Sequence, residues 1–311
     1  MNPALATCLR AATDVPARAS VAAWWPRWRD GAAQAATPAA QALLGGFDAD
    51  RVGWAFASGY QAALRALLPD MPADAVAAFC VTEEAGNRPR DIRTRFTPAA
   101  DGSVSISGAK RWTTLGPDSS LLLVVGALPG VDDGARVQLK VARVPAGTPG
   151  LQLLPMPETR FVPEVPHARV QLDAVAVDAA ALLPGDGYER YVKPFRTIED
   201  AHVTLAVLAY LLRETRARGW PSAFAERLCA TMIALTEIAA SPADAPATHV
   251  VLTGALAQAH ALYAEAGTLW AQTADDPAAQ RWQRDAALFG VAGSARSQRA
   301  ARAWERLNEG H

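Results

Sequence analysis

The chain has 311 residues, 50% hydrophobic and 20% charged, which is typical of a soluble globular protein with room for two or three packed units. Its formal net charge of −1 argues against a nucleic-acid-binding surface. The three cysteines and five histidines show no metal-ligand spacing, so we expect no metal site. The N-terminus has no signal-peptide pattern and no apolar run could cross a bilayer, so we expect a cytoplasmic protein without membrane contact.

Residues 1–78 are predicted to form a short helical domain. Val52 to Leu68 carries apolar residues at helical spacing, and Pro69 and Pro72 follow where this helix should end. Three earlier tryptophans are expected to pack in a core or an interface, with ligand stacking as the alternative: Trp24, Trp25 and Trp28.

Residues 79–184 are predicted to form a β domain. Apolar and polar residues alternate from Ile92 to Phe96, which predicts a strand. Ala100-Asp101-Gly102 predicts a turn, and the alternation at Val104 to Ile106 completes a hairpin. The wholly apolar run from Leu121 to Val125 predicts a buried strand.

A further strand is predicted in this domain. Turn residues at Asp132 to Gly134 and Gly147 to Gly150 flank a strand from Gln138 to Val144. Two polar segments interrupt the strand pattern and are expected to be loops that could hold a functional site: Thr82 to Arg90 and Lys110 to Ser119.

Residues 185–311 are predicted to be helical. Thr197-Ile-Glu-Asp200 fits a helix-capping pattern, and the apolar run from Val203 to Leu212 predicts a central, buried helix. Gly219-Trp-Pro221 should end that helix. Three more helices complete a predicted antiparallel bundle: Ala223 to Ala240, Thr248 to Thr273 and Pro277 to Leu307.

Several motifs in one order resemble the middle domain of the acyl-CoA dehydrogenase family. They are Cys-Val-Thr-Glu from Cys80, Glu-Ala-Gly from Glu84, Ile-Arg-Thr from Ile92 and Gly-Ala-Lys-Arg-Trp-Thr-Thr from Gly108, followed by the apolar strand. The likeness covers roughly residues 78–190. It implies an α+β fold with a short helical N-terminal domain (1–78), a β middle domain (79–184) and a C-terminal helical bundle (185–311). Compared with the family, the N-terminal part is short.

The resemblance also implies a cofactor site for FAD. In the family, the residues that match Val81, Thr82, Trp112 and Thr114 contact the flavin ring through backbone and hydroxyl donors and a packed indole. The alternative is that threonine and tryptophan simply suit strand ends.

The loop that follows Thr82 departs from the family pattern, because it is one residue shorter and lacks the usual proline and Ser-Asp pair. Asn87 stands where the serine helps to hold cofactor or acyl-CoA, and it could still donate a hydrogen bond. Arg88 and Arg90 could meet a phosphate of the substrate or cofactor. Solvated surface arginines are the alternative, and we expect Asn87 and Arg88 as substrate contacts.

The family removes the α-proton of a thioester with a glutamate while hydride passes to the flavin. The Tyr-Glu-Gly-Thr-like motif that often carries this glutamate is absent here. Other members place the base early in the first bundle helix, where Glu199 is the candidate, since burial could raise its pKa to a useful value. The alternatives are a helix cap for Asp200, a helix-dipole partner for Glu199, and His202 at the matching turn.

The function implied by the resemblance is α,β-dehydrogenation of an acyl-CoA or a related small substrate. The same scaffold also resembles that of flavin monooxygenases and nitroalkane oxidases, so the resemblance indicates the fold more firmly than the reaction. The rival hypothesis is a catalytically inactive paralogue that acts as a binding or partner subunit. Because bundle helices in the family pack between subunits, and the ends of this chain are rich in alanine, leucine and tryptophan, we expect a homodimer or homotetramer. The sequence leaves the substrate and the electron acceptor open.

Overall fold

The computed structural model describes residues 2–129, 137–273, 275–291 and 293–309, and its contacts group into two compact units. The helical unit comprises Met1–Asp70, Thr159–Glu164 and Phe195–His311, and the β unit comprises Met71–Glu158 and Val165–Pro194. The division into three domains stays a prediction, and the turn predicted at 132–134 lies outside the described residues.

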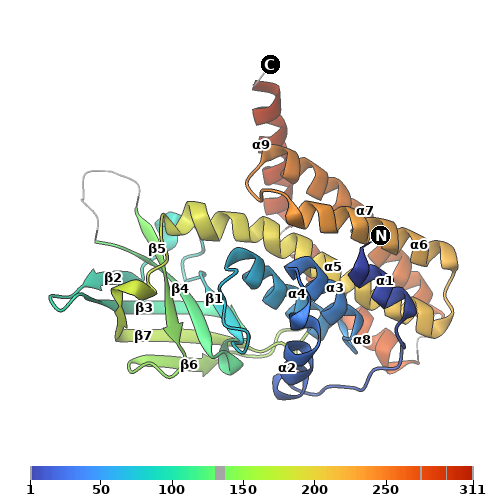
Figure 1. Ribbon diagram of the computed structural model, residues 1–311, viewed down its shortest axis with the longest axis horizontal. Helices are drawn as coiled ribbons and strands as arrows, with labels where there is room; N and C mark the ends of the chain where they lie inside the picture. Colours follow the sequence, from blue (N-terminus) through green and yellow to red (C-terminus); the bar gives the residue numbers. More distant parts are fainter. Residues whose placement is uncertain (1, 130–136, 274, 292, 310–311) are drawn as a thin grey trace. The chain divides into compact units, whose positions relative to one another are not determined.

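The β unit is built on one mixed seven-stranded sheet with the order β1-β4-β2-β3-β7-β6, to which β5 adds by pairing with β4 (Figure 1). Inward-facing side chains of the strands form its core, which includes Phe96, Ile106, Val124 and Val170. The strands are β1 (Ala77–Cys80), β2 (Arg95–Pro98), β3 (Ser103–Thr114), β4 (Leu121–Ala127), β5 (Leu139–Pro145), β6 (Leu151–Pro155) and β7 (His167–Asp178).

The hairpin and the buried strand are confirmed. Strands β2 and β3 pair antiparallel across the turn at Gly102, and every residue of β4 is buried. The predicted strand from Ile92 begins only at Arg95, although the residues from Ile92 to Phe96 do alternate between buried and exposed. The reason is that the amides of Arg93 and Thr94 donate to the carboxylate of Glu83 instead of to a neighbouring strand.

The prediction of a loop from Lys110 to Ser119 was wrong for residues 110–114. Strand β3 continues to Thr114, because its polar residues pair with β7 and the side chain of Lys110 is fully buried. Strand β6 was not predicted, since its sequence Leu151-Gln-Leu-Leu-Pro155 is short and ends in proline.

The helical unit contains two groups of helices from the two ends of the chain (Figure 1). Residues 204–212 of α5 are all buried, as the apolar run predicts. The helices are α1 (Pro3–Arg10), α2 (Val21–Asp30), α3 (Pro38–Phe47), α4 (Val52–Leu67), α5 (Lys193–Arg218), α6 (Ser222–Ala240), α7 (Pro246–Ala271), α8 (Pro277–Asp285) and α9 (Gly293–Glu309). None of the described helices is long and apolar enough to span a membrane.

The tryptophans of the N-terminal segment form a packed core, as predicted. Trp24 stacks on Trp54 with ring centroids 5.6 Å apart, and Trp28 is also buried. Helix α4 packs closely on α5 at Gly59, where an added Cβ would lie 2.6 Å from the Cα of Val203. A glycine is therefore required for this close approach of the two backbones.

Two helix boundaries differ from the prediction. Helix α5 does not begin at Thr197, because a π-helical turn at Tyr188–Val192 leads into it and the carboxylate of Asp186 accepts the first amides, at 2.9 Å from Tyr188 and 2.8 Å from Glu189. Thr197 and Asp200 lie inside the helix. The predicted helix from Pro277 to Leu307 is divided into α8 and α9 by a 3₁₀ turn at Ala286–Gly290.

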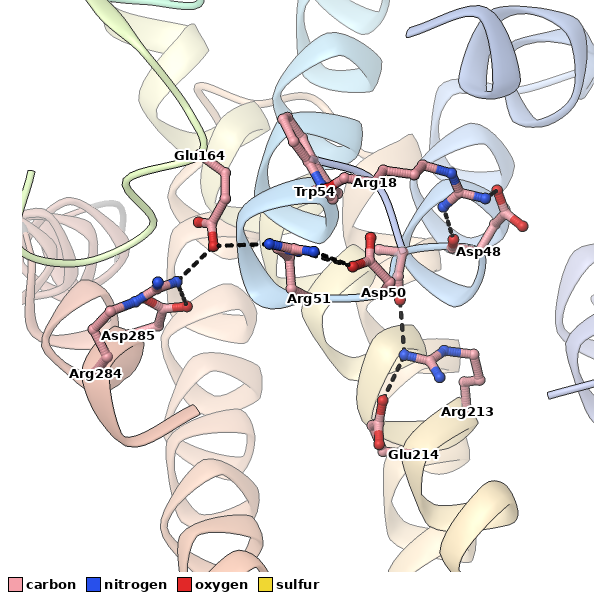
Figure 2. Close-up of polar contacts among 11 residues, drawn as sticks. Arg18, Asp48, Asp50, Arg51, Trp54, Glu164, Arg213, Glu214, Arg284 and Asp285 are labelled. Atoms are coloured by element: carbon pink, nitrogen blue, oxygen red, sulfur yellow. Dashed lines mark hydrogen bonds and ion pairs between the residues drawn. The ribbon is translucent and has the colours of Figure 1, made fainter. Parts of the chain in front are cut away.

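The segment Thr159–Glu164 runs between β6 and β7 but belongs to the helical unit, where buried charges hold it (Figure 2). The amide of Val162 donates to Asp285 at 2.7 Å, and Val162 has the positive φ of 41°, rare for a β-branched residue. The carboxylate of Glu164 pairs with Arg284 at 2.8 Å and with Arg51 at 3.5 Å. Because Asp285 also pairs with Arg284, α8 ends on a buried ion network.

Candidate functional site

The structure brings the four predicted flavin contacts together at one place in the β unit. Val81 and Thr82 directly follow strand β1, and Trp112 and Thr114 lie at the end of β3. The main-chain amide of Arg111 donates to the carbonyl of Thr82 at 2.8 Å. Segments that are about thirty residues apart in sequence are therefore joined directly, and we call Val81–Glu83 the corner 81–83.

A β-bulge gives Trp112 its position. Lys110 pairs with Val170 and Thr113 with Ala168, so Arg111 and Trp112 together face a single residue of β7. Trp112 takes a positive φ of 53° and its side chain is 46% exposed. A bulge redirects a side chain out of the regular pleat, and bulges are frequent beside active sites. Here the bulge presents a large apolar ring to the surface of the β unit.

Two residues that the sequence did not single out complete the surroundings of Trp112. Its amide donates to the sulfur of Met156 at 3.3 Å. The ring of His167 meets the indole edge-on, with centroids 5.9 Å apart, and its Nε2 lies 3.5 Å from the hydroxyl of Thr114. Burial lowers the pKa of His167, so its ring is neutral at pH 7. Because these contacts follow from the pairing of β3, β6 and β7, no local pattern in the sequence could reveal them.

A buried ion pair lies behind this surface. The Nζ of Lys110 lies 2.6 Å from Oε1 of Glu83 and 3.4 Å from the carbonyl of Val81. The side chain of Lys110 is 0% exposed and that of Glu83 is 6% exposed. Burial alone would raise the pKa of Glu83, but the charge and the hydrogen bonds of Lys110, with those from Arg93 and Thr94, outweigh it and lower this pKa.

The two predicted substrate contacts lie in the exposed loop that follows this corner. Asn87 and Arg88 are exposed, and the amide of Arg88 donates to Asp91 at 3.1 Å. Glu83 and Gly86 exchange main-chain hydrogen bonds at 2.8 and 3.1 Å, so the loop is a tight turn. The substrate role of Asn87 and Arg88 stays a prediction.

The groups around Trp112 suit a flat aromatic cofactor with a polar edge. The exposed indole and the thioether of Met156 offer apolar contact, while Thr82 and Thr114, both partly exposed, carry hydroxyl groups at the same place. The residues present therefore fit a flavin ring. Among the described residues, no group of three histidine, cysteine, aspartate or glutamate side chains that could hold a metal ion occurs.

Glu199 lies in the helical unit, inside α5. Its side chain is partly buried, and burial, followed by the neighbouring carboxylate of Asp200, raises its pKa to about 7 although Arg296 and Arg196 oppose the shift. Such a carboxylate is half ionised near neutral pH, which suits a general base. Its catalytic role stays a prediction.

The predicted capping role of Asp200 was wrong. Its carboxylate instead pairs with two arginines of α9, at 2.7 Å from Arg296 and 2.6 Å from Arg299. His202 is a packed helix residue: its ring is 1% exposed, its Nδ1 lies 2.7 Å from the carbonyl of Ile198, and burial lowers its pKa to about 4. Burial thus moves the pKa of Glu199 to about 7 and that of His202 away from neutrality, to about 4.

No protein-family model matches the chain, and no curated protein matches it significantly. Solved structures do resemble it. Butyryl-CoA dehydrogenase from Megasphaera elsdenii is 16% identical, with a TM-score of 0.62 over 85% of this chain and 80% of that one. Glutaryl-CoA dehydrogenase from Mycobacterium smegmatis in complex with FADH2 is 15% identical, with a TM-score of 0.58 over 90% and 89%. FkbI, for biosynthesis of the methoxymalonyl extender unit of a polyketide, is 20% identical, with a TM-score of 0.62 over 88% and 84%.

Proposed function

We propose that this chain, which has the acyl-CoA dehydrogenase fold, is a flavin-dependent oxidoreductase that binds FAD and dehydrogenates an acyl-CoA or a related small substrate. The observation that carries the proposal is the junction of Thr82 with Arg111, beside the bulged and exposed Trp112. Two motifs that the family resemblance associates with a flavin are adjacent in space there. Solved proteins of this fold include complexes with FADH2 and with FAD, which supports the choice of cofactor.

In this proposal the β unit binds and orients the ring. The indole of Trp112 packs against it, and Val81, Thr82 and Thr114 donate hydrogen bonds from main chain and hydroxyl groups to its polar edge. FAD, when bound, supplies the acceptor for a hydride from the β-carbon of the substrate. The neutral ring of His167 holds the Thr114 hydroxyl in place through the contact between its Nε2 and that hydroxyl.

Glu199 is the proposed base. Its carboxylate takes the α-proton of the substrate, so the proton moves to the carboxylate while the C–H electron pair forms the new double bond. A pKa of about 7 lets the group exist as carboxylate at neutral pH and still hold the proton that it takes. Asn87 and Arg88 are proposed to contact the substrate.

The experiment that tests this function is anaerobic reduction of the flavin-loaded protein by a panel of short-, medium- and long-chain acyl-CoAs. Loss of the flavin absorption with at least one substrate is the expected result. A protein that holds FAD but is reduced by none of them would favour the second candidate, a partner subunit without dehydrogenase activity. One observation favours that candidate. The carboxylate of Asp200, the other acidic group near the start of α5, is paired with two arginines and is therefore not free to act as a base.

The protein is further proposed to be a cytoplasmic homodimer or homotetramer. A groove of about 470 Å³ between α6 and α7 supports the proposal; it is lined by alanines, among them Ala230, Ala234 and Ala255, and by polar residues that include Arg227 and Glu265. Small residues let a second helix approach closely, and Val251 on the same stripe of α7 is 56% exposed. Light scattering should give a mass of at least twice 32.8 kDa, and the mass of one chain at working concentration would refute the proposal.

A further inference from the structure

Glu83 makes more hydrogen bonds than its position in a loop requires. Its Oε2 accepts from the amide of Arg93 at 2.6 Å. Its Oε1 accepts from the amide of Thr94 at 3.0 Å, from the hydroxyl of Thr94 at 2.7 Å and from Lys110 at 2.6 Å. A single carboxylate therefore holds the segment before β2 and the strand β3 to the corner 81–83.

The contact of Thr94 depends on a second irregularity in β3. The pairing of β3 with β7 shifts between Ile106 and Gly108, and Gly108 has a φ of 149°. A Cβ on Gly108 would lie 2.6 Å from the hydroxyl oxygen of Thr94. The sequence thus keeps the space beside Gly108 open so that Thr94 can reach Glu83.

Lys110 and Arg111 hold the same corner from consecutive positions. The buried ammonium of Lys110 contacts Glu83 and the carbonyl of Val81, while the amide of Arg111 donates to the carbonyl of Thr82. The bulge that starts after Lys110 frees this amide from pairing with β7, and the next residue is Trp112. The residue that anchors the corner is therefore two positions from the exposed indole.

We propose that Lys110 and Glu83 are positioning residues for the cofactor. Their buried pair fixes the corner 81–83 relative to the bulged Trp112, so that the hydrogen-bonding groups of the corner and the indole can contact the same flavin ring. The inference rests on the proposed flavin function. Neither side chain is exposed enough to contact the cofactor itself. Partners behind a binding shell that hold its members in place contribute about 10- to 100-fold in affinity where this has been measured around bound metal ions.

A pair that serves folding alone would give a different result from a positioning pair. Replacing a buried ion pair by neutral residues of similar volume is often neutral for stability, whereas removing one partner is not. The double variant Glu83→Gln/Lys110→Met therefore keeps the packing and removes the charges and the ammonium donor. Glu84→Gln is the matched control, because Glu84 is exposed and pairs with Arg111 at the surface.

The experiment is a titration of the FAD-free wild type, the double variant and the control with FAD, followed by flavin fluorescence and absorption. Circular dichroism and thermal unfolding establish that each protein is folded. We expect the dissociation constant of the double variant to rise by about tenfold or more, with its absorption bands moved toward those of free FAD, while Glu84→Gln behaves as wild type.

The outcomes separate the positioning role of Glu83 and Lys110 from the proposed flavin function. A folded double variant with wild-type affinity and band positions overturns the positioning inference and leaves the flavin function standing. A wild type without affinity for FAD overturns the flavin function, and the inference falls with it. If the double variant does not fold, Thr94→Val is measured instead, because it loosens Glu83 and keeps both charges; unchanged binding by this variant also overturns the inference.

Discussion

The ammonium of Lys110 lies 2.6 Å from the carboxylate of Glu83, and both side chains are buried in the β unit. Removing one of them leaves the other charge buried without its counter-charge. We therefore expect Lys110→Met alone to lower the free energy of unfolding by roughly 3–5 kcal/mol, and Glu83→Gln/Lys110→Met to lower it by much less. Urea unfolding at pH 7 measures both. Equal losses in the single and double variants would mean that the charges do not depend on each other.

Glu199→Gln tests the proposed base. The amide keeps the shape of the side chain but cannot take a proton, so we expect the rate of flavin reduction by an active acyl-CoA to fall by about 10²- to 10⁴-fold. In the wild type this rate should rise with pH and level off above about 7, the pKa to which burial and Asp200 raise Glu199. Stopped-flow absorption measures both effects.

The control for this variant is Glu237→Gln, which changes an exposed glutamate on α6. It should be reduced at the wild-type rate. If Glu199→Gln is reduced as fast as the control, Glu199 has a structural role and the base lies elsewhere.

Replacing Glu199 should slow flavin reduction but raise the stability of the fold at alkaline pH. Its folded-state pKa of about 7 is above the ordinary value of 4.5, so the uncharged form is favoured in the fold. The stability that it contributes is fully present below about pH 4.5 and is lost as the pH rises through about 7. We expect Glu199→Gln to unfold at a higher urea concentration than wild type at pH 8, with a smaller difference at pH 5. A larger gain at pH 5 than at pH 8 would contradict the raised pKa.

The sequence predicted most of this architecture because its strongest patterns are local. The all-buried strand β4, the alternation around the turn at Gly102 and the helix from Val52 follow from hydrophobic periodicity and from turn residues. The α+β fold class is confirmed by the structure and by the solved structures that resemble it.

The errors arose where a distant side chain replaced a local partner. The strand predicted from Ile92 starts at Arg95 because Glu83 takes two amides that a strand would otherwise use. Helix α5 starts before Thr197 because Asp186, eleven residues earlier, caps the turn that leads into it. Local propensity does not contain such contacts.

The site was only partly predictable for the same reason. The resemblance placed Thr82 and Trp112 in one site, and the structure joins their segments through Arg111. Met156 and His167 reach Trp112 because β7 pairs with β3 and β6 pairs with β7, which only the sheet topology reveals. The burial of Lys110 could not be predicted either, since a lysine in a polar segment is usually exposed.

Asp285 holds the segment Thr159–Glu164 in the helical unit. Its buried carboxylate accepts a hydrogen bond from the amide of Val162 at 2.7 Å. It also pairs with Arg284 at 2.7 Å (Figure 2). Asp285→Asn should lower the free energy of unfolding by roughly 1.5–3 kcal/mol, because the charged hydrogen bonds between Asp285 and Arg284 are lost while Arg284 keeps its pair with Glu164. Asp275→Asn, at an exposed position, is the control. Similar unfolding midpoints for the two variants would show that the segment does not need this charge.

An FAD titration of the wild type, Trp112→Leu and Trp304→Leu tests whether the protein binds a flavin at Trp112. Both tryptophans are exposed, at 46% and 55%, but only Trp112 lies on the bulge beside the corner 81–83. We expect the wild type and Trp304→Leu to bind FAD with shifted absorption bands, and Trp112→Leu to bind it about tenfold more weakly, since aromatic contacts with a flat ring contribute about 1 kcal/mol or more. A colourless wild type that takes up no FAD at high micromolar concentration would contradict the proposed flavin function.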